Sequence, residues 1–202
     1  MSNELNIVIH GYFGFGNVGD EAILSVLIEE FKAIFNKAEF VVLSSNPQRT
    51  MKIHSVKAIR ERLTSLGFWK HFLRSHILVF AGGGRYGYTT WRRIVLLALL
   101  AELLGKVVIF RGVGVYPYEW RGRPIISERP VAFKGLTGLL IRLALSKVSY
   151  ISVRDKYSYM VLRLTGVKRS IAIEEDLAFR LKLPDLSECK ELAIKYDIHE
   201  GR

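Results

Sequence analysis

Short apolar segments alternate with segments of helical periodicity along almost the whole chain, and this alternation constrains the fold more than any other feature. The first apolar segment, LNIVIH at 5–10, precedes a glycine-rich stretch and a run of apolar residues at helical spacing that ends near residue 36. Six further apolar segments are predicted strands: 39–45, 55–59, 76–84, 106–114, 149–155 and 170–176. Nearly continuous apolar strands are typical of a sheet that is covered on both faces. The sequence therefore predicts an α/β fold with a Rossmann-like, doubly wound parallel sheet.

The segments between these strands complete the predicted alternation. Helices are expected over about 60–74, 90–104, 136–147 and 156–166. The NPQRT stretch at 46–50 is predicted as a turn, and the proline- and arginine-containing stretch 115–134 is predicted to be irregular. The last stretch, 183–202, is predicted to be a linker with a short charged helix.

Charge and cysteine content narrow the class of protein. The 202 residues carry a net charge of +11, which favours anionic partners such as phosphorylated substrates, acidic glycans or a membrane surface. The basic residues are scattered and no nucleic-acid-binding motif is present, so no nucleic-acid partner is expected. The chain has a single cysteine and no visible signal peptide, and its longest apolar stretch, 94–105, is too short to span a bilayer. These features predict a cytoplasmic protein, and peripheral contact with the inner face of a membrane is left open.

Glycine-rich stretches follow three of the predicted strands, at 11–19, 82–84 and 112–114. Ligands of parallel α/β sheets bind beyond the carboxyl ends of the strands, so these loops are expected to meet at one binding edge. Glycines let the backbone approach a ligand closely and expose N–H groups to it. The candidate binding glycines are Gly14, Gly16, Gly19, Gly82, Gly83, Gly84 and Gly112.

The first loop matches the G-x-G-x-x-G pattern of dinucleotide-binding proteins, but its surroundings favour another ligand. Asp20 and Glu21 occupy the first turn of the following helix, where they would repel a pyrophosphate. No acidic residue ends the second strand to hold a ribose diol. Arg49 could neutralise a 2′-phosphate, so an NADP-binding oxidoreductase domain stays an alternative.

Asn17, Asp20 and Glu21 have two interpretations. Their amide and carboxylate groups can hydrogen-bond the hydroxyls of a sugar, and we expect them to bind substrate in this way. Asn and Asp are also favoured where helices begin, so simple capping is the competing interpretation.

Six segments, in this order and spacing, resemble the polysaccharide pyruvyl transferase family over residues 5–180: GYFGFGNVGDEAIL, VVLSSNPQRT, ILVFAGGG, VVIFRGVGVYP, ISVRDKYSYMVLRLTGV and EEDLAF. The resemblance implies a two-lobed, glycosyltransferase-B-like protein that transfers a pyruvyl group from phosphoenolpyruvate to a sugar hydroxyl of a cell-surface glycan, leaving a ketal. It implies that 1–182 form the N-terminal lobe and that 183–202 are a linker and the start of a missing or separate second lobe. The chain departs from the family in RYGYTTWRR, which lacks an acidic residue, and in Arg111, where the family usually has Gln.

The reaction implied by the resemblance needs cations and groups that transfer protons, and charged residues at the ends of predicted strands are the candidates in this chain. The resemblance itself implies that much of the donor-binding set lies in the second lobe. Arg111 and Arg154 are the expected cationic binders of the donor, and Asp155 pairs with Arg154. His10 and Asp176 are the candidates for proton transfer. Structural ion pairing, capping and a hydrogen-bonded core histidine are the competing interpretations of these residues.

The expected partners are phosphoenolpyruvate, a glycan acceptor and a second-lobe protein or further copies of the chain, with contact to a lipid carrier left open. The histidines show no metal-ligand spacing, so no metal is predicted, and no cofactor is expected besides the donor substrate. A non-catalytic sugar- or nucleotide-binding module is the main alternative to an enzyme.

Overall fold

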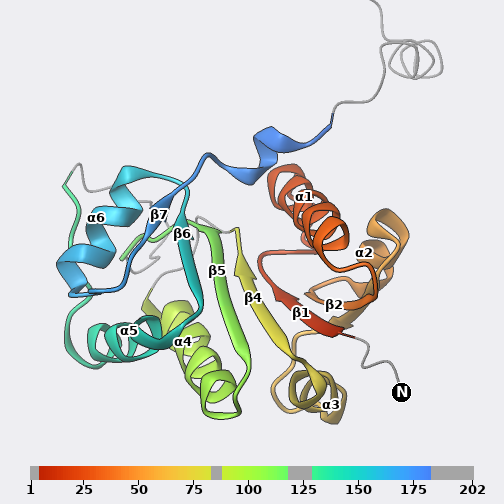
Figure 1. Cartoon of the computed structure of the whole chain (residues 1–202), viewed down its shortest axis with the longest axis horizontal. Coiled ribbons are helices and arrows are strands. Elements are labelled where there is room, and N and C mark those ends of the chain that lie inside the picture. The colour runs from red at the N-terminus through yellow and green to blue at the C-terminus, as the bar shows by residue number, and fades with distance from the viewer. Residues whose placement is uncertain (1–4, 83–87, 118–128, 183–202) are drawn as a thin grey trace, which may run out of the picture.

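The computed structural model describes residues 5–82, 88–117 and 129–182, and within them the strands form one seven-stranded, all-parallel sheet (Figure 1). The strand order is β3-β2-β1-β4-β5-β6-β7, so the order reverses between β1 and β4. The strands are β1 (Leu5–His10), β2 (Ala38–Ser44), β3 (Lys57–Arg60), β4 (Ile77–Ala81), β5 (Val107–Val113), β6 (Tyr150–Val153) and β7 (Ala172–Ile173). The Rossmann-like, doubly wound parallel sheet expected from the apolar alternation is confirmed.

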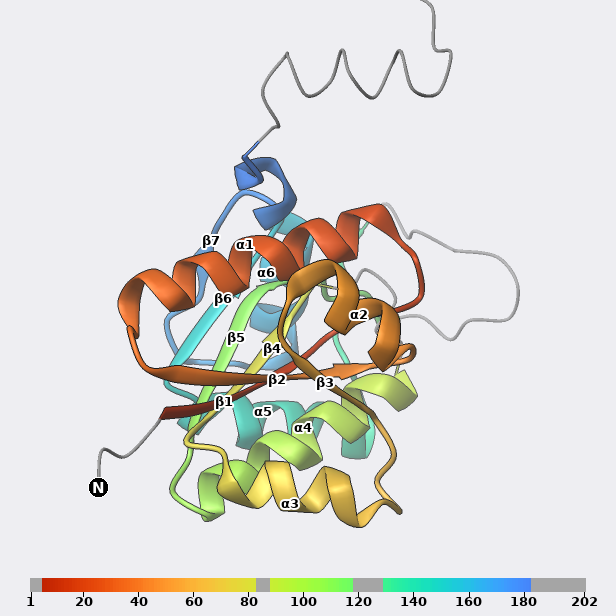
Figure 2. The ribbon, with the colours of Figure 1, turned by 90° about the vertical axis from the view of Figure 1, so that its right-hand side faces the viewer.

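Helices cover the two faces of this sheet (Figure 2). On one face lie α1 (Val18–Ile34), α2 (Pro47–His54) and the short 3-10 helix η1 (Leu177–Arg180). The other face carries α3 (Leu66–Arg74), α4 (Tyr88–Leu103), α5 (Gly135–Lys147) and α6 (Lys156–Thr165). This division follows from right-handed crossovers, because the chain builds outward from β1 in one direction and then returns to build in the other.

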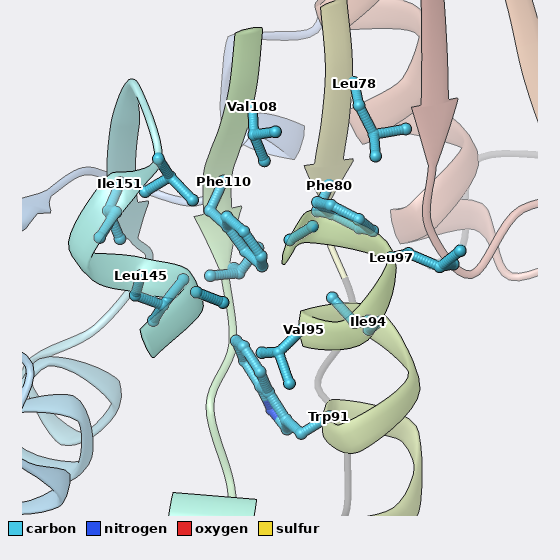
Figure 3. Packing of buried hydrophobic residues seen from close by; sticks show 14 of the residues in the cluster. Leu78, Phe80, Trp91, Ile94, Val95, Leu97, Val108, Phe110, Leu145 and Ile151 are labelled. Atoms are coloured by element: carbon cyan, nitrogen blue, oxygen red, sulfur yellow. The ribbon is translucent and has the colours of Figure 1, made fainter. Parts of the chain in front are cut away.

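Each face has its own hydrophobic core. The larger core lies under α3–α6, where Trp91 stacks on Phe110 with ring centroids 5.9 Å apart, and Phe110 stacks on Phe80 at 4.7 Å (Figure 3). The smaller core packs Leu24 and Leu27 of α1 against β1 and β4. Two buried faces explain why the strands read as unbroken apolar runs.

The predicted elements differ from the observed ones mainly at their ends. The turn predicted at 46–50 is wrong: the Asn46 side chain caps α2 by accepting a hydrogen bond from Arg49 N at 3.2 Å, and Pro47 starts the helix. The helix predicted from residue 60 begins only at Leu66, with Ser65 as its cap. β5 ends at Val113, close to the end of the predicted strand 106–114, so Gly112 lies in the strand and not in a loop after it.

Glu102 makes the stability of this fold depend on pH. Both carboxylate oxygens are buried and have no hydrogen-bond partner among the described residues. Burial therefore raises the pKa of Glu102 to about 7, against the opposing pull of Lys147 and Arg169. A carboxyl whose pKa is raised in the folded state contributes stability that is fully present below its unfolded value of 4.5 and is lost as the pH rises through about 7.

Glu102→Gln is therefore expected to stabilise the protein at pH 8 and to have little effect at pH 4.5. We expect a gain of about 1 kcal/mol at pH 8, after discounting for the partial exposure of the carboxyl. Urea unfolding at the two pH values measures it, with Glu175→Gln on the exposed surface as the control. Equal effects of Glu102→Gln at both pH values would contradict the assignment.

Candidate functional site

The carboxyl ends of β1 and β4 form the centre of the candidate site, because the strand order reverses between these two neighbours. The loops that follow them are in direct contact. A side chain at Gly11 would bring its Cβ to 2.7 Å from the Ala81 carbonyl oxygen, and one at Gly82 would approach Asp20 Oδ1 to 3.2 Å. The structure thus brings the first two predicted glycine loops together, as far as Gly82; Gly83 and Gly84 lie outside the described residues.

The first loop is held against the end of β2. Gly14 has a φ of +79°, and a Cβ there would lie 2.1 Å from Ser44 Oγ and 2.6 Å from Asn46 N. Ser45 N donates to the Phe13 carbonyl at 3.0 Å. Gly14 is therefore required both for its backbone conformation and for the close approach of two backbone segments.

Glu21 fastens the same loop to α2. One carboxylate oxygen accepts a hydrogen bond from Gly14 N at 2.9 Å, and the other lies 2.9 Å from His54 Nε2. The remaining ring nitrogen of His54 lies 3.1 Å from Ser25 Oγ. His54 is almost fully buried, so this network joins the loop, α1 and α2 in the interior. Sequence reasoning missed His54, because its partner is 33 residues away in the chain.

The other polar residues of α1's first turn have different surroundings. Asn17 caps α1, since its Oδ1 accepts from Gly19 N at 3.1 Å. Asp20 is only 8% exposed and lies beside Gly82, at the centre of the strand-order reversal. Gly16 has a φ of +81° and lies next to Arg49: a Cβ at Gly16 would be 3.0 Å from Nη1 of the guanidinium. The capping interpretation thus describes Asn17, whereas Asp20 borders the candidate site, and a ligand role for either residue stays a prediction.

A second polar cluster gathers where β5, β6 and β7 end. Arg154 lies 3.1 Å from Asp176 and 3.8 Å from Asp155 in two ion pairs, and its Nη2 lies 3.5 Å from the Tyr116 hydroxyl. Tyr116 donates to Asp155 Oδ2 at 2.8 Å. Asp155 also caps α6 by accepting from Ser158 N at 2.6 Å. The predicted pairing of Arg154 with Asp155 is present, and Asp176 joins it from a distant part of the chain.

Burial shapes the acid–base properties of this cluster. Desolvation raises the pKa of Tyr116, so the phenol keeps its proton at neutral pH. Burial alone would lower the pKa of Arg154, but Tyr116, Asp176 and Asp155 outweigh it and raise the pKa. The guanidinium therefore stays charged and offers a fixed cation at this edge, about a quarter exposed to solvent.

Arg111 and Gly112 lie elsewhere. The Arg111 guanidinium pairs with Glu174 at 3.0 Å and with Glu30 of α1 at 3.2 Å, and Glu174 also accepts a hydrogen bond from Tyr150. Gly112 is part of an irregular stretch of β5, where a Cβ would touch Leu177. Both residues thus face the α1 side of the sheet, and the structure does not bring Arg111 together with Arg154; binding by either residue stays a prediction.

His10, the last residue of β1, and Glu61, which directly follows β3, form a third polar cluster. His10 is 2% exposed, and its Nε2 lies 3.2 Å from Glu61 Oε1 without the alignment of a hydrogen bond. Arg93 pairs with the same oxygen at 3.0 Å. Sequence reasoning missed Glu61, because a helix predicted from residue 60 concealed that this carboxylate directly follows a strand at the carboxyl edge.

In the parts of the chain that the structure describes, no group of three or more His, Cys, Asp or Glu side chains is placed to hold a metal ion. Among the helices described, none has the length and apolar character needed to cross a membrane.

Comparison with known proteins adds one finding. A family model described as Polysaccharide pyruvyl transferase matches residues 17–199, from the cap of α1 to beyond the last described residue. No curated protein matches the chain.

Proposed function

Since the chain belongs to the polysaccharide pyruvyl transferase family, we propose that it forms part of an enzyme that transfers a pyruvyl group from phosphoenolpyruvate to a glycan. The family match over 17–199 is the observation that carries this proposal. The polar clusters at the carboxyl edge of the sheet support this proposal, because the reaction needs cations and carboxylates close together at a binding surface.

The chemistry sets what such a site must supply. Protonation at the methylene carbon of phosphoenolpyruvate leaves positive character on C2. The oxygen of a sugar hydroxyl then adds to C2 and gives up its proton, the bond from C2 to the phosphate oxygen breaks, and phosphate leaves with the electron pair. A second hydroxyl of the same sugar then adds to C2 and gives up its proton, which completes the ketal; of the two hydroxyl protons, one balances the proton added at the methylene carbon and the other leaves with the phosphate. The site must therefore supply a cation that binds the donor. It must also supply a group that donates a proton to the methylene carbon and groups that accept protons from the sugar hydroxyls.

Arg154 is the residue of the described chain that we assign to the donor. Its guanidinium is charged, partly exposed and fixed by two carboxylates, which suits an anionic phosphate or carboxylate. Asp176 accepts a hydrogen bond from Arg154, and we propose that it orients this guanidinium and accepts a proton at the same edge. We assign the acceptor sugar to the edge beside the first loop, where Asp20 lies next to Gly82.

Arg154→Ala is expected to abolish phosphoenolpyruvate binding and to lower the unfolding free energy by about 1–2 kcal/mol, because two carboxylates and Tyr116 lose their shared partner. Saturation-transfer NMR with phosphoenolpyruvate and urea unfolding measure the two effects. Arg180→Ala is the matched control, since its ion pair with Glu30 is exposed. Unchanged donor binding by the Arg154 variant would overturn its assignment.

The activity test is release of phosphate from phosphoenolpyruvate in the presence of sugar acceptors. It is run with this chain alone and with any protein encoded beside it, because we infer that a second lobe, joined through 183–202 or supplied by another chain, completes the active site. Acceptor-dependent phosphate release is the expected result. Glycoside binding without phosphate release under either condition would favour the alternative of a non-catalytic sugar-binding module.

We also infer that the protein contacts an anionic membrane surface peripherally. The helices α4 and α5 are neighbours (Figure 1). They expose four leucines to solvent, namely Leu96, Leu103, Leu139 and Leu143. Arg142 and Lys147 are exposed on α5 as well, and the chain carries a net charge of +11. Apolar side chains next to basic ones are typical of surfaces that bind anionic lipid headgroups.

Co-sedimentation with vesicles tests this contact. We expect binding to vesicles that contain about 30% anionic lipid, loss of binding for the pair Leu139→Glu and Leu143→Glu, and weaker binding in high salt. Leu66→Glu on α3 is the matched control, because Leu66 is equally apolar and 87% exposed. Equal binding of all three proteins would contradict the inference.

A further inference from the structure

A cavity of about 330 Å³ opens at the carboxyl ends of the first three strands, beside the glycine loop that follows β1. Its walls include Phe15 from the loop, Ser45 after β2, Arg60 and Glu61 at the end of β3, and Arg93 from α4. These residues come from four separate parts of the chain, so tertiary folding alone assembles the cavity. A concave site with convergent polar groups and an aromatic wall is the usual form of a small-molecule site.

Glu61 supplies a fixed negative charge on one wall. Its Oε1 lies 3.0 Å from Arg93 Nη2 and 3.2 Å from Nε2 of the buried His10. Burial by itself would raise the pKa of Glu61, but His10 and Arg93 reverse the effect and lower it. The carboxylate is thus ionised at neutral pH, where it only accepts hydrogen bonds. Arg93 is ion-paired with Glu61, and Arg60 lines the same cavity. At its own position, the ionised Glu61 favours a hydroxyl donor over an anionic group.

Phe15 supplies a flat apolar surface to the cavity, in contrast to the charged side chain of Glu61. The ring is 58% exposed and stacks on Tyr12 with centroids 4.0 Å apart and an interplanar angle of 5°. The loop that carries it is fixed by the contacts of Gly14 with Glu21 and Asn46, so the stack is held in place before any ligand arrives. A large exposed aromatic ring on a rigid loop at the rim of a polar cavity is a feature of a binding surface.

We infer that this cavity binds one neutral pyranose unit of the acceptor glycan, with a ring face against Phe15 and adjacent hydroxyls donating to the Glu61 carboxylate. A pyranose has both properties that the walls require: an apolar face of C–H groups and an edge of hydroxyl donors. Glu61 contacts the sugar, and His10 is a positioning residue behind it. The inference rests on the proposed function, because that function makes a sugar the acceptor, and it adds where the sugar binds and what chemistry recognises it.

Titration with methyl glycosides tests the inference directly. The probes are the methyl pyranosides of glucose, galactose and mannose, followed by saturation-transfer NMR and calorimetry on the full chain. We expect at least one of them to bind in the millimolar range. Glu61→Gln and Phe15→Ala are each expected to weaken this binding about tenfold, by loss of a charged hydrogen bond and of the stacking surface. His10→Gln is expected to weaken it less and to move the loss of affinity at acid pH to a higher pH, because the pKa of Glu61 rises when His10 no longer lowers it.

The controls separate binding from folding. Phe179→Ala removes an aromatic ring that is 84% exposed on η1, and Glu175→Gln removes an exposed carboxylate after β7; neither is expected to change glycoside affinity. Because Phe15 is mostly exposed, Phe15→Ala tests the site even if Glu61→Gln fails to fold. Unchanged affinity of the Phe15 variant, absence of binding to every neutral glycoside, or tighter binding of methyl glucuronide than of methyl glucoside would overturn the inference.

A separate measurement of phosphate release distinguishes two outcomes: that this inference is wrong, or that the proposed function is wrong. Glycoside binding that depends on Phe15 and Glu61 without phosphate release leaves the sugar site standing and counts against the transferase. Phosphate release whose acceptor KM is unchanged in both variants supports the transferase and overturns the sugar site.

Discussion

Gly14→Ala is expected to lower the free energy of unfolding by about 3–4 kcal/mol, which corresponds to a fall in Tm of roughly 10 °C. Two costs add. The φ of +79° at Gly14 disfavours any side chain, and the new Cβ would lie 2.6 Å from the backbone nitrogen of Asn46. A backbone atom cannot turn away as a flexible side chain can, so the loop must separate from the end of β2. Glycoside binding in the cavity beside the loop is expected to be lost in parallel.

Gly105→Ala is the matched control for this prediction. Gly105 has a φ of +71°, but no atom lies within 4 Å of the position that a Cβ would take. Only the backbone term then applies, and we expect a loss of about 1 kcal/mol. Chemical denaturation of the wild type and both variants gives the difference. Equal losses for the two variants would mean that the contact of the loop with β2 contributes nothing.

Glu21→Ala is expected to cost about 2–3 kcal/mol, because it leaves a loop N–H and a ring nitrogen of the buried His54 without their partner. The Glu21 carboxylate is 12% exposed, so water cannot replace it well. Differential scanning calorimetry measures the loss. Glu21→Gln keeps an acceptor for Gly14 N and is expected to recover about half of it.

The result also decides between two roles of the first helical turn. One outcome is that Glu21→Ala lowers Tm and weakens glycoside binding together, in proportion to the loosening of the loop. In that case Glu21 is a positioning residue and not a ligand of the sugar. Asp20→Ala is the informative comparison, because Asp20 borders Gly82 at the strand-order reversal. Loss of binding by the Asp20 variant at unchanged Tm would assign the sugar contact to Asp20. A large loss of Tm with unchanged affinity in both variants would leave them with structural roles alone.

Local residue patterns were sufficient to predict the fold. Strands buried on both faces must be apolar at nearly every position, and amphipathic helices must repeat their apolar residues at helical spacing, so both signals are present in short windows such as 5–10 and 18–34. The errors lie where one side chain decides the local structure. Asn46 caps α2 and turns a predicted turn into a helix, and Ser65 delays the start of α3.

The candidate site was predictable only in part. The loop after β1 and the Arg154–Asp155 pair carry their signal within a few neighbouring residues, and the structure places both at the carboxyl edge of the sheet. Arg111 follows the same rule in sequence, yet its guanidinium is engaged by carboxylates on the α1 side. The direction of a side chain along a strand depends on the exact register of the bulged strand β5, which no local pattern specifies.

The sequence by itself thus determined the layers, the parallel sheet and the edge at which polar loops gather, because burial and periodicity are properties of neighbouring residues. Only the tertiary structure decided which polar groups meet. His10 and Glu61, Glu21 and His54, and Arg154 and Asp176 are separated by 22 to 51 residues in the chain, and each pair is joined within 3.2 Å by the packing of different strands and helices. Contacts of this kind depend on the summed geometry of the whole sheet, so no stretch of sequence contains them.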